Sequence, residues 1–379
     1  MSLTKRWEDF KTEMRPRLSE WRFMLRRMRQ SNLALAGLII ILCFVGIACL
    51  APFLAPLPAS NRGNPWIIPQ DQTFLDLGLY NRPVPPSVGH IFGTAYEQYD
   101  IYYACIWGTI TAFRVGLTVV AISLCAGLII GTLAAFYGGI IDEALMRFTD
   151  IILAFPGLIL AVAIVEAFQT GSIPLNISIL LLGVSAFFLV ILLGLRRDRS
   201  GLIAALVFAV VVAVSLFTYE YRPLIWVLHL GKLDEVLIAL TLVGWPGYAR
   251  LIRGEVLRVK NEDFVEASKA SGSSDFRTIT RHVLPNSIYP VFIVATLDIG
   301  SVILTAAALA FIGVGAPPNY PDWGQLVSSS QYAMTNAQDM VAYFHAFFIP
   351  GLFIAMFVVG WNLLGDALRD VLDPMLRRR

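Results

Sequence analysis

The chain has 379 residues, of which 57% are hydrophobic and only 15% are charged, and its formal net charge is +2. Soluble domains carry about 25% charged residues, so this composition excludes an ordinary soluble protein and indicates an integral membrane protein. The four cysteines have neither metal-ligand spacing nor the pattern of a disulfide framework, and we interpret them as apolar packing residues.

Residues 1–32 form a segment of mixed charge that does not have the pattern of a signal peptide. Large apolar residues, from Trp7 to Met28, recur there at steps of three and four, which predicts an amphipathic helix that Pro16 kinks. We expect this cytoplasmic N-terminal segment to lie either on the membrane surface or against a partner subunit.

A membrane-spanning helix needs about 20 largely apolar residues, and eight stretches of the sequence meet or approach that length. The predicted spans are Leu33–Leu57, Val115–Tyr137, Ile151–Phe168, Asn176–Leu195, Gly201–Phe217, Val236–Tyr248, Pro290–Val314 and Phe344–Leu364. The run at 236–248 is short, so we expect its helix to extend at either end.

Basic residues predict the orientation of these spans, because cytoplasmic connections are enriched in Lys and Arg. Nine basic residues precede the first span, seven lie between Arg250 and Arg281, and three close the chain, whereas residues 316–343 contain none. With eight spans, both termini fall in the cytoplasm. The Pro-rich loop 58–114 and the loop that carries Trp323 then fall outside.

No catalytic constellation is present in the sequence. The four histidines are isolated, and neither H-E-x-x-H nor G-x-S-x-G occurs. The phosphate-binding pattern G-x-x-x-x-G-K-[ST] is also missing, so the chain is not expected to hydrolyse ATP by itself. We therefore predict a non-enzymatic protein with no cofactor of its own, in which any ATP and Mg²⁺ are bound by partner subunits.

Asp298 is the ionisable residue that stands well inside a predicted span. Ionisable residues within membrane segments are expensive and are therefore functional candidates. Two interpretations stay open: Asp298 lines a transport pathway, or it is paired locally in a structural role.

The connection formed by residues 250–286 is polar but has the residues of two short helices. A helix with a small, partly apolar face is predicted around Ala267, and Gly272 permits the left-handed geometry that ends a helix. Asp275 can begin a second helix, and Pro285 marks the start of the next span. Two short helices held close to the membrane make a rigid knob that another protein can grip.

The spacing of residues in this connection resembles the EAA loop found in permease subunits of ATP-binding-cassette (ABC) importers. The residues that carry the resemblance are Glu266, Ala267, Ser268, Gly272, His282, Leu284 and Pro285. In that family the loop docks in a cleft on the ATPase subunit. The resemblance implies that Glu266 pairs at the docking surface, that Gly272 sets the bend and that Pro285 sets the exit angle. Ser268 stands where the family has a second alanine.

Four further segments resemble the dipeptide/oligopeptide branch of these permeases, in its C-type subunit. They are Met146–Pro156, Gly244–Arg250, Phe311–Gly315 and Asn362–Asp370. The similarity covers nearly the whole chain from Asn32 onward.

The resemblance implies an all-α transmembrane bundle of the type I ABC importer kind, with six family helices. The hairpin 176–217 is an addition to these six, which gives about eight spans. The permease domain then covers residues 115–365, and residues 366–379 form a cytoplasmic tail. A second departure is Gly93–Asp100, which keeps only part of the family pattern before the second span.

The implied function is one half of a translocation path in a prokaryotic plasma membrane. The expected partners are a second permease, one or two ATPase subunits, an extracytoplasmic substrate-binding protein and the lipid bilayer. Nucleic acid is not an expected partner. The solute reaches the outer loops, around Trp66 and Trp323. Peptides are the expected substrate, with oligosaccharides, nickel and glutathione as alternatives. A stand-alone secondary transporter and a membrane enzyme are the competing classes, but no internal repeat or catalytic cluster favours them.

Overall fold

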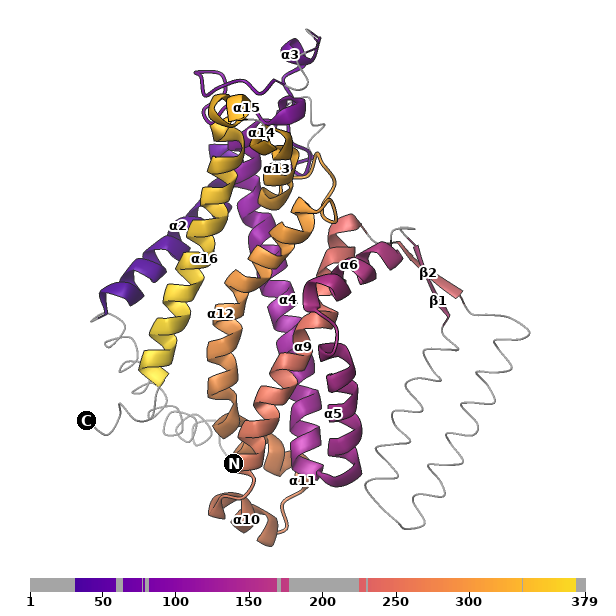
Figure 1. The fold of residues 1–379 in the computed structure, drawn as a ribbon. Coiled ribbons are helices and arrows are strands. Elements are labelled where there is room, and N and C mark those ends of the chain that lie inside the picture. The colour runs from indigo at the N-terminus through magenta and orange to yellow at the C-terminus, as the bar shows by residue number, and fades with distance from the viewer. Residues whose placement is uncertain are drawn as a thin grey trace, which may run out of the picture.

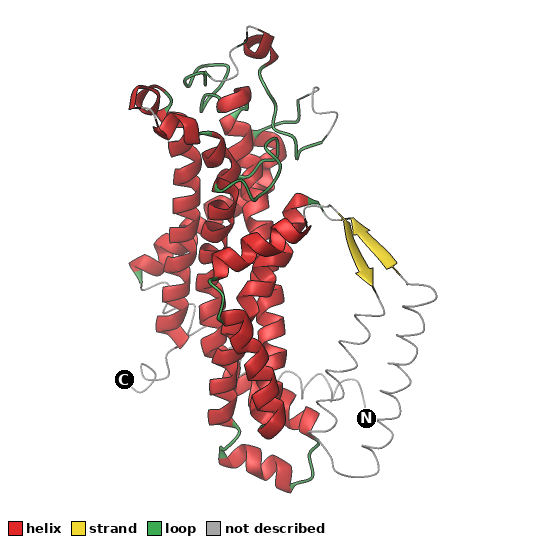
Figure 2. Cartoon of the chain, turned by 45° about the vertical axis from the view of Figure 1, so that its right-hand side comes forward, coloured by secondary structure: helices red, strands yellow, loops and turns green. Residues whose placement is uncertain are grey.

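The computed structural model describes residues 31–58, 64–76, 78, 82–168, 172–176, 225–229, 231–335 and 337–372. These residues form a long helical bundle with a two-stranded ribbon at one side (Figures 1 and 2). The predicted all-helical membrane fold is confirmed, and the ribbon is an addition to it. The predicted N-terminal helix and most of the predicted hairpin 176–217 lie outside the described residues.

The secondary structure has three groups of elements. The long helices are α2 (Asn32–Leu54), α4 (Ile101–Tyr137), α9 (Lys232–Val259), α12 (Leu284–Phe311) and α16 (Phe344–Leu372). Two helices of intermediate length are α5 (Gly139–Leu153) and α6 (Gly157–Phe168). The short elements are α3 (Gln72–Asp76), η2 (Tyr96–Gln98), β1 (Ser172–Asn176), β2 (Ile225–His229), α10 (Asp263–Ala270), α11 (Asp275–Thr278), η3 (Ile279–Val283), α13 (Trp323–Ser329), α14 (Gln331–Thr335) and α15 (Ala337–Ala342).

Within the described residues, five helices are long and apolar enough to cross a membrane. They are α2, α4, α9, α16 and the continuous helix Asp275–Phe311, which joins α11, η3 and α12. Together α5 and α6 make a sixth candidate, but they meet at an angle of 87°. Of the eight predicted spans, six therefore have a counterpart here. The runs 176–195 and 201–217 lie outside the described residues, apart from Asn176 at the end of β1.

The predicted span Ile151–Phe168 is wrong as a single helix. The chain breaks between Leu153 and Gly157, where α5 ends and α6 begins. Pro156 has no backbone N–H to continue the α5 hydrogen bonds, and it disfavours helical geometry at the preceding residue. Average hydropathy does not register this effect, because Ala154, Phe155 and Pro156 are all compatible with an apolar run.

Three other boundaries also differ from those predicted. Helix α4 starts 14 residues earlier than Val115, because Asp100 caps it by accepting a hydrogen bond from the backbone N–H of Tyr103 at 2.8 Å. Helix α9 extends in both directions, as expected, and ends at Val259. Helix α16 runs on to Leu372, eight residues beyond the predicted end of the span at Leu364.

Helix α4 runs along the length of the bundle. Its 37 residues span about 55 Å at 1.5 Å per residue, well beyond the roughly 30 Å of bilayer hydrocarbon. In Figure 1 it runs from the end of the bundle that carries α3 and α13–α15 to the end that carries α10. We refer to these as the α3 end and the α10 end.

Helices α4 and α9 approach so closely that their backbones touch. A Cβ atom at Gly131 would lie 2.2 Å from the carbonyl oxygen of Ala249, and one at Gly127 would lie 2.4 Å from Cβ of Tyr248. Nearby, the hydroxyl of Ser123 donates to the carbonyl of Thr241 at 3.2 Å. Small residues permit this contact, which is how helices commonly associate in membranes.

Trp323 anchors an aromatic core near the α3 end. It is 2% exposed, and its indole N–H donates to the carbonyl of Cys105 at 3.1 Å. The ring centroid of Phe44 lies 5.8 Å from Trp323, and that of Phe357 lies 5.7 Å from it. Trp323 therefore joins α2, α4, α13 and α16. The sequence predicts that solute arrives around Trp323, but its buried ring packs inside the protein instead.

The segment predicted as an outer loop is folded. We call residues 64–76, 78 and 82–100 the cap segment. It is attached to the loop before α13, because the backbone N–H of Ile68 donates to Asn319 at 2.8 Å and Trp66 stacks on Tyr320 with centroids 5.5 Å apart. Inside it, the buried Thr94 accepts from the N–H of Val84 at 2.7 Å.

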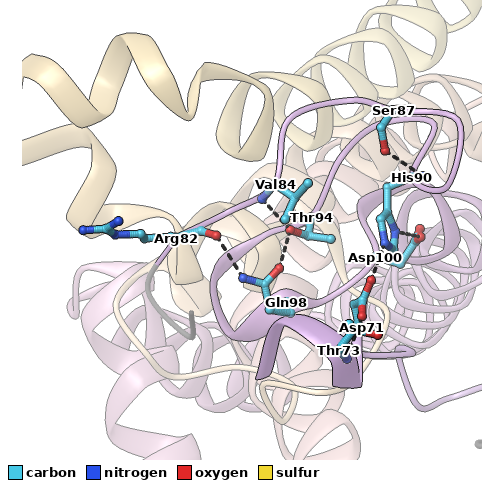
Figure 3. Close-up of polar contacts among 9 residues, drawn as sticks. All are labelled: Asp71, Thr73, Arg82, Val84, Ser87, His90, Thr94, Gln98 and Asp100. Carbon is cyan, nitrogen blue, oxygen red and sulfur yellow. Dashed lines mark hydrogen bonds and ion pairs between the residues drawn. The ribbon is translucent and has the colours of Figure 1, made fainter. Parts of the chain in front are cut away.

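His90 connects three parts of the cap segment (Figure 3). Its Nδ1 lies 3.0 Å from a carboxylate oxygen of Asp100, and its Nε2 lies 2.9 Å from one of Asp71. Burial alone lowers the pKa of His90, but the hydrogen bonds and charges of Asp100 and Asp71 offset this, and the net pKa is raised. Both ring nitrogens donate when the ring is charged, so the imidazolium form fits both contacts.

We predict that Gly131→Ala destabilises the bundle, because the added methyl collides with a backbone carbonyl that cannot move aside. The expected cost is about 1–3 kcal/mol, as for other overpacked cores. Gly254→Ala is the matched control, because Gly254 lies in α9 and, apart from the adjacent part of its own helix, no atom of the described residues lies within 4 Å of the added methyl. The thermal unfolding midpoint in detergent should fall for the first variant only. Equal midpoints for the two variants would contradict the α4–α9 contact.

We predict that the cap segment loosens as the pH rises. Because folding raises the pKa of His90, the stabilisation is fully present below the ordinary value of about 6.5 and is lost as the pH passes the raised value. Hydrogen exchange of residues 64–100, corrected for the intrinsic pH dependence, should reveal the change. The variant His90→Gln should show cap-segment exchange that no longer depends on pH in this range. A pH dependence identical to that of the wild type would rule out His90 as its source.

Candidate functional site

The connection between α9 and α12 forms a compact knob at the α10 end (Figure 1). Helix α10 has one side facing the protein, where Val265 is fully buried and Ser268 is 8% exposed. The hydroxyl of Ser268 lies 3.4 Å from that of Thr278, which ties α10 to the start of the next helix. Glu266 and Ala267 lie on the exposed side. The structure therefore separates the predicted residues into a packing face and a free face.

Gly272 ends α10 in the geometry predicted from the sequence. Its φ is +79°, which L-residues with a side chain rarely adopt. The N–H of Ser273 donates to the carbonyl of Ser268 at 3.2 Å, and the N–H of Gly272 donates to Lys269 at 2.9 Å. These two bonds form a Schellman motif, which satisfies the last carbonyls of the helix.

The second predicted helix of the knob continues directly into the membrane span. Asp275 begins a helix that runs without interruption to Phe311. Pro285 is the second residue of α12, as predicted, but the helical path already begins at Asp275. A π-helical turn, η3, directly precedes α12, and the amide of Asn286 donates to the carbonyl of His282 at 2.6 Å. Pro285 has no N–H for the usual bond four residues back, and the π-helical turn lies at the place where that bond is missing.

The remaining predicted residues lie close to this turn. His282 and Leu284 are half-buried, whereas Pro285 is exposed. The structure thus brings His282, Leu284 and Pro285 together on one turn, whereas Glu266 and Ala267 lie on α10. A role for them in docking stays a prediction.

Two lysines hold the knob against the end of α4, and sequence reasoning missed both. The ammonium of Lys260 donates to the carbonyl of Ala135 at 2.6 Å, and that of Lys269 lies 4.9 Å from the ring centroid of Phe136. A cation is favourable at the carboxyl end of a helix, where the carbonyls lack partners. The contacts join residues more than a hundred positions apart, so no local pattern signals them.

Asp298 lies on α12 and is half-buried. It interacts electrostatically with Tyr248 of α9, whose side chain is 3% exposed. This placement between two packed helices supports the structural alternative, and a role in the pathway stays a prediction.

The described ranges contain no group of three or more His, Cys, Asp or Glu side chains placed to hold a metal ion. The exposed face of α10 carries acidic, small and aromatic residues and Lys269, and Phe264 is 43% exposed.

Comparison with known proteins agrees with this geometry. Residues 200–378, which contain the knob, match the family described as binding-protein-dependent transport system inner membrane component. Residues 19–86 match the N-terminal transmembrane domain of oligopeptide transport permease C.

Curated relatives extend over almost the full chain. The chain is 31% identical to a dipeptide transport system permease protein of Alkalihalophilus pseudofirmus, over 95% of this chain and 91% of the relative. It is 29% identical to a glutathione transport system permease protein of Pectobacterium atrosepticum, over 94% and 92%. It is 28% identical to an oligopeptide transport system permease protein of Bacillus subtilis, over 95% and 92%. The chain therefore belongs to the membrane permeases of ABC importers, in the dipeptide and oligopeptide branch of that family.

Proposed function

We propose that this chain forms half of the translocation path of an ATP-driven importer for peptides. The observation that carries the proposal is the free face of α10, supported by Val265 and Ser268 and ended by Gly272. A short, rigid helix projecting from two membrane helices can be gripped by another protein, and its displacement moves both helices as rigid bodies.

The ATPase subunits are the partners that fit this face. The sequence has no phosphate-binding loop, so the energy for uphill transport must enter through a protein contact. ATP and Mg²⁺ are bound by one or two such subunits. Glu266 pairs with the docking cleft, and the small side chain of Ala267 permits close approach. A second, homologous permease completes the path.

The α10 end faces the cytoplasm. The basic residues of the described chain support this orientation, because seven lie between Arg250 and Arg281 and none lies between residues 316 and 343. Helix α16 starts beside α15 and runs toward the α10 end (Figure 1), so the C-terminus is cytoplasmic. The cap segment then faces outward, where a substrate-binding protein delivers solute.

Peptides are the proposed substrate class. Three relatives carry names that specify transport of dipeptides, oligopeptides and glutathione, which is itself a small peptide. The solute retained by the binding protein that accompanies this chain identifies the substrate directly.

We expect Gly272→Val to uncouple transport. Valine at a positive φ costs about 1–2 kcal/mol, a factor of about 5–30 in the population of the correct turn. ATP-driven peptide uptake should fall by a similar factor while the amount of protein in the membrane stays normal. Ser274→Val is the matched control, because Ser274 is exposed, has an extended backbone and uses no side-chain cap. Uptake by the Gly272 variant equal to that of this control would contradict the assigned role.

Purification of the tagged chain from its native membrane tests the whole proposal. We expect a second permease and one or two ATPases to be recovered with it, and reconstituted uptake to require ATP. Recovery of the chain alone, in a form that transports peptide without ATP, would overturn the proposal. Glu266→Arg should reduce recovery of the ATPases and leave recovery of the second permease unchanged.

A further inference from the structure

Two arginines of α9 form ion pairs with α5, just before the knob. Arg253 binds Asp142 through two parallel contacts, Nε to Oδ1 and a terminal nitrogen to Oδ2, each 2.6 Å long. Arg250 binds Asp150 at 2.6 Å. The first pair is the better shielded, with side chains 34% and 19% exposed, against 52% and 48% for the second. Two-pronged arginine–carboxylate pairs are both strong and directional.

Helix α5 is also attached to α4, through an adjacent face. Ile141 and Leu145 are buried against Ala134, with Leu133 packed around them. Because α4 and α9 touch at Gly131, the three helices pack against one another. Helix α5 makes apolar contacts with α4 and ion pairs with α9.

The main chain alone does not make α5 move with α9. Helix α5 is followed by the break at residues 154–156, and the bend of 87° leaves it without helical continuity into α6. Contacts between side chains therefore attach α5 to the helix that ends in the knob: the two ion pairs, and the ring of Phe148, which stacks on Trp245 with centroids 5.8 Å apart. The two arginines lie within ten residues of Lys260, which fastens the knob to α4.

We propose that Arg253, assisted by Arg250, is a positioning residue for transport that makes α5 follow α9 when the knob is displaced. The movement then reaches the broken span α5–α6, and not only the two helices that the knob connects. This inference rests on the proposed coupling function. It assigns the larger effect to Arg253, because its pair is two-pronged and less exposed to solvent.

The test uses the complete importer reconstituted in lipid vesicles, with peptide uptake and ATP hydrolysis measured on the same sample. Arg253→Gln should lower the number of peptides transported per ATP by about fivefold or more, a typical lower bound for coupling between sites. The variant with exchanged charges, Arg253→Asp with Asp142→Arg, should recover most of the loss. A purely structural role would reduce the amount of assembled importer. ATP hydrolysis and peptide uptake would then fall together, and the number of peptides transported per ATP would stay unchanged.

The control is the pair Arg258 and Glu255, whose ion pair of 2.9 Å lies within α9 itself. Arg258→Gln with Glu255→Gln should leave transport per ATP unchanged. If Arg253→Gln does not assemble, Arg253→Lys keeps the charge but loses the two-pronged contact, and an intermediate ratio is expected.

The inference is overturned if Arg253→Gln transports as many peptides per ATP as the wild type, or if the exchanged pair recovers nothing at normal abundance. Its failure is distinct from failure of the proposed function. If only the inference fails, the wild-type complex still requires ATP for uptake. If the proposed function fails, the wild-type complex itself does not require ATP.

Discussion

The backbone contact between α4 and α9 is the constraint on which the rest of the structure depends. Inside a bilayer, apolar side chains gain little by leaving lipid for protein, so close packing of small residues must hold helices together. Gly127 and Gly131 provide that packing. With α9 fixed against α4, the residues before the knob face α5, and Lys260 reaches the end of α4. The position of the knob thus follows from two glycines in the membrane.

Features governed by local sequence could be predicted from the sequence. Long apolar runs identified α2, α12 and α16, and a glycine after a short helix identified the turn at Gly272. The break before Gly157 could not be predicted from average hydropathy, because Pro156 acts through a missing N–H and a steric clash. Similarly, Tyr and Thr residues lowered the apparent hydropathy of the first turns of α4, although Asp100 caps the helix there.

Features built from distant residues were inaccessible. The carboxylates around His90 come from positions 10 and 19 residues away, and Arg253 meets Asp142 across 111 residues. Neither contact produces a repeating pattern in the sequence from which it could be predicted. The family resemblance contained Asp150 and Arg250 in separate motifs, yet only the fold brings them together. The EAA resemblance located the knob in the sequence. The contacts that attach the knob to α4, and α9 to α5, could be found only from the structure.

The ribbon of β1 and β2 has a consequence for how such a chain changes over time. The strands pair antiparallel, from Ser172 with His229 to Asn176 with Ile225, so the main chain leaves the bundle and returns at one point. Because the two strands are joined, the helix before the ribbon and the helix after it keep fixed attachment points. An ancestral gene can therefore lengthen, shorten or lose that stretch in a single event, and the remaining helices keep their order and direction.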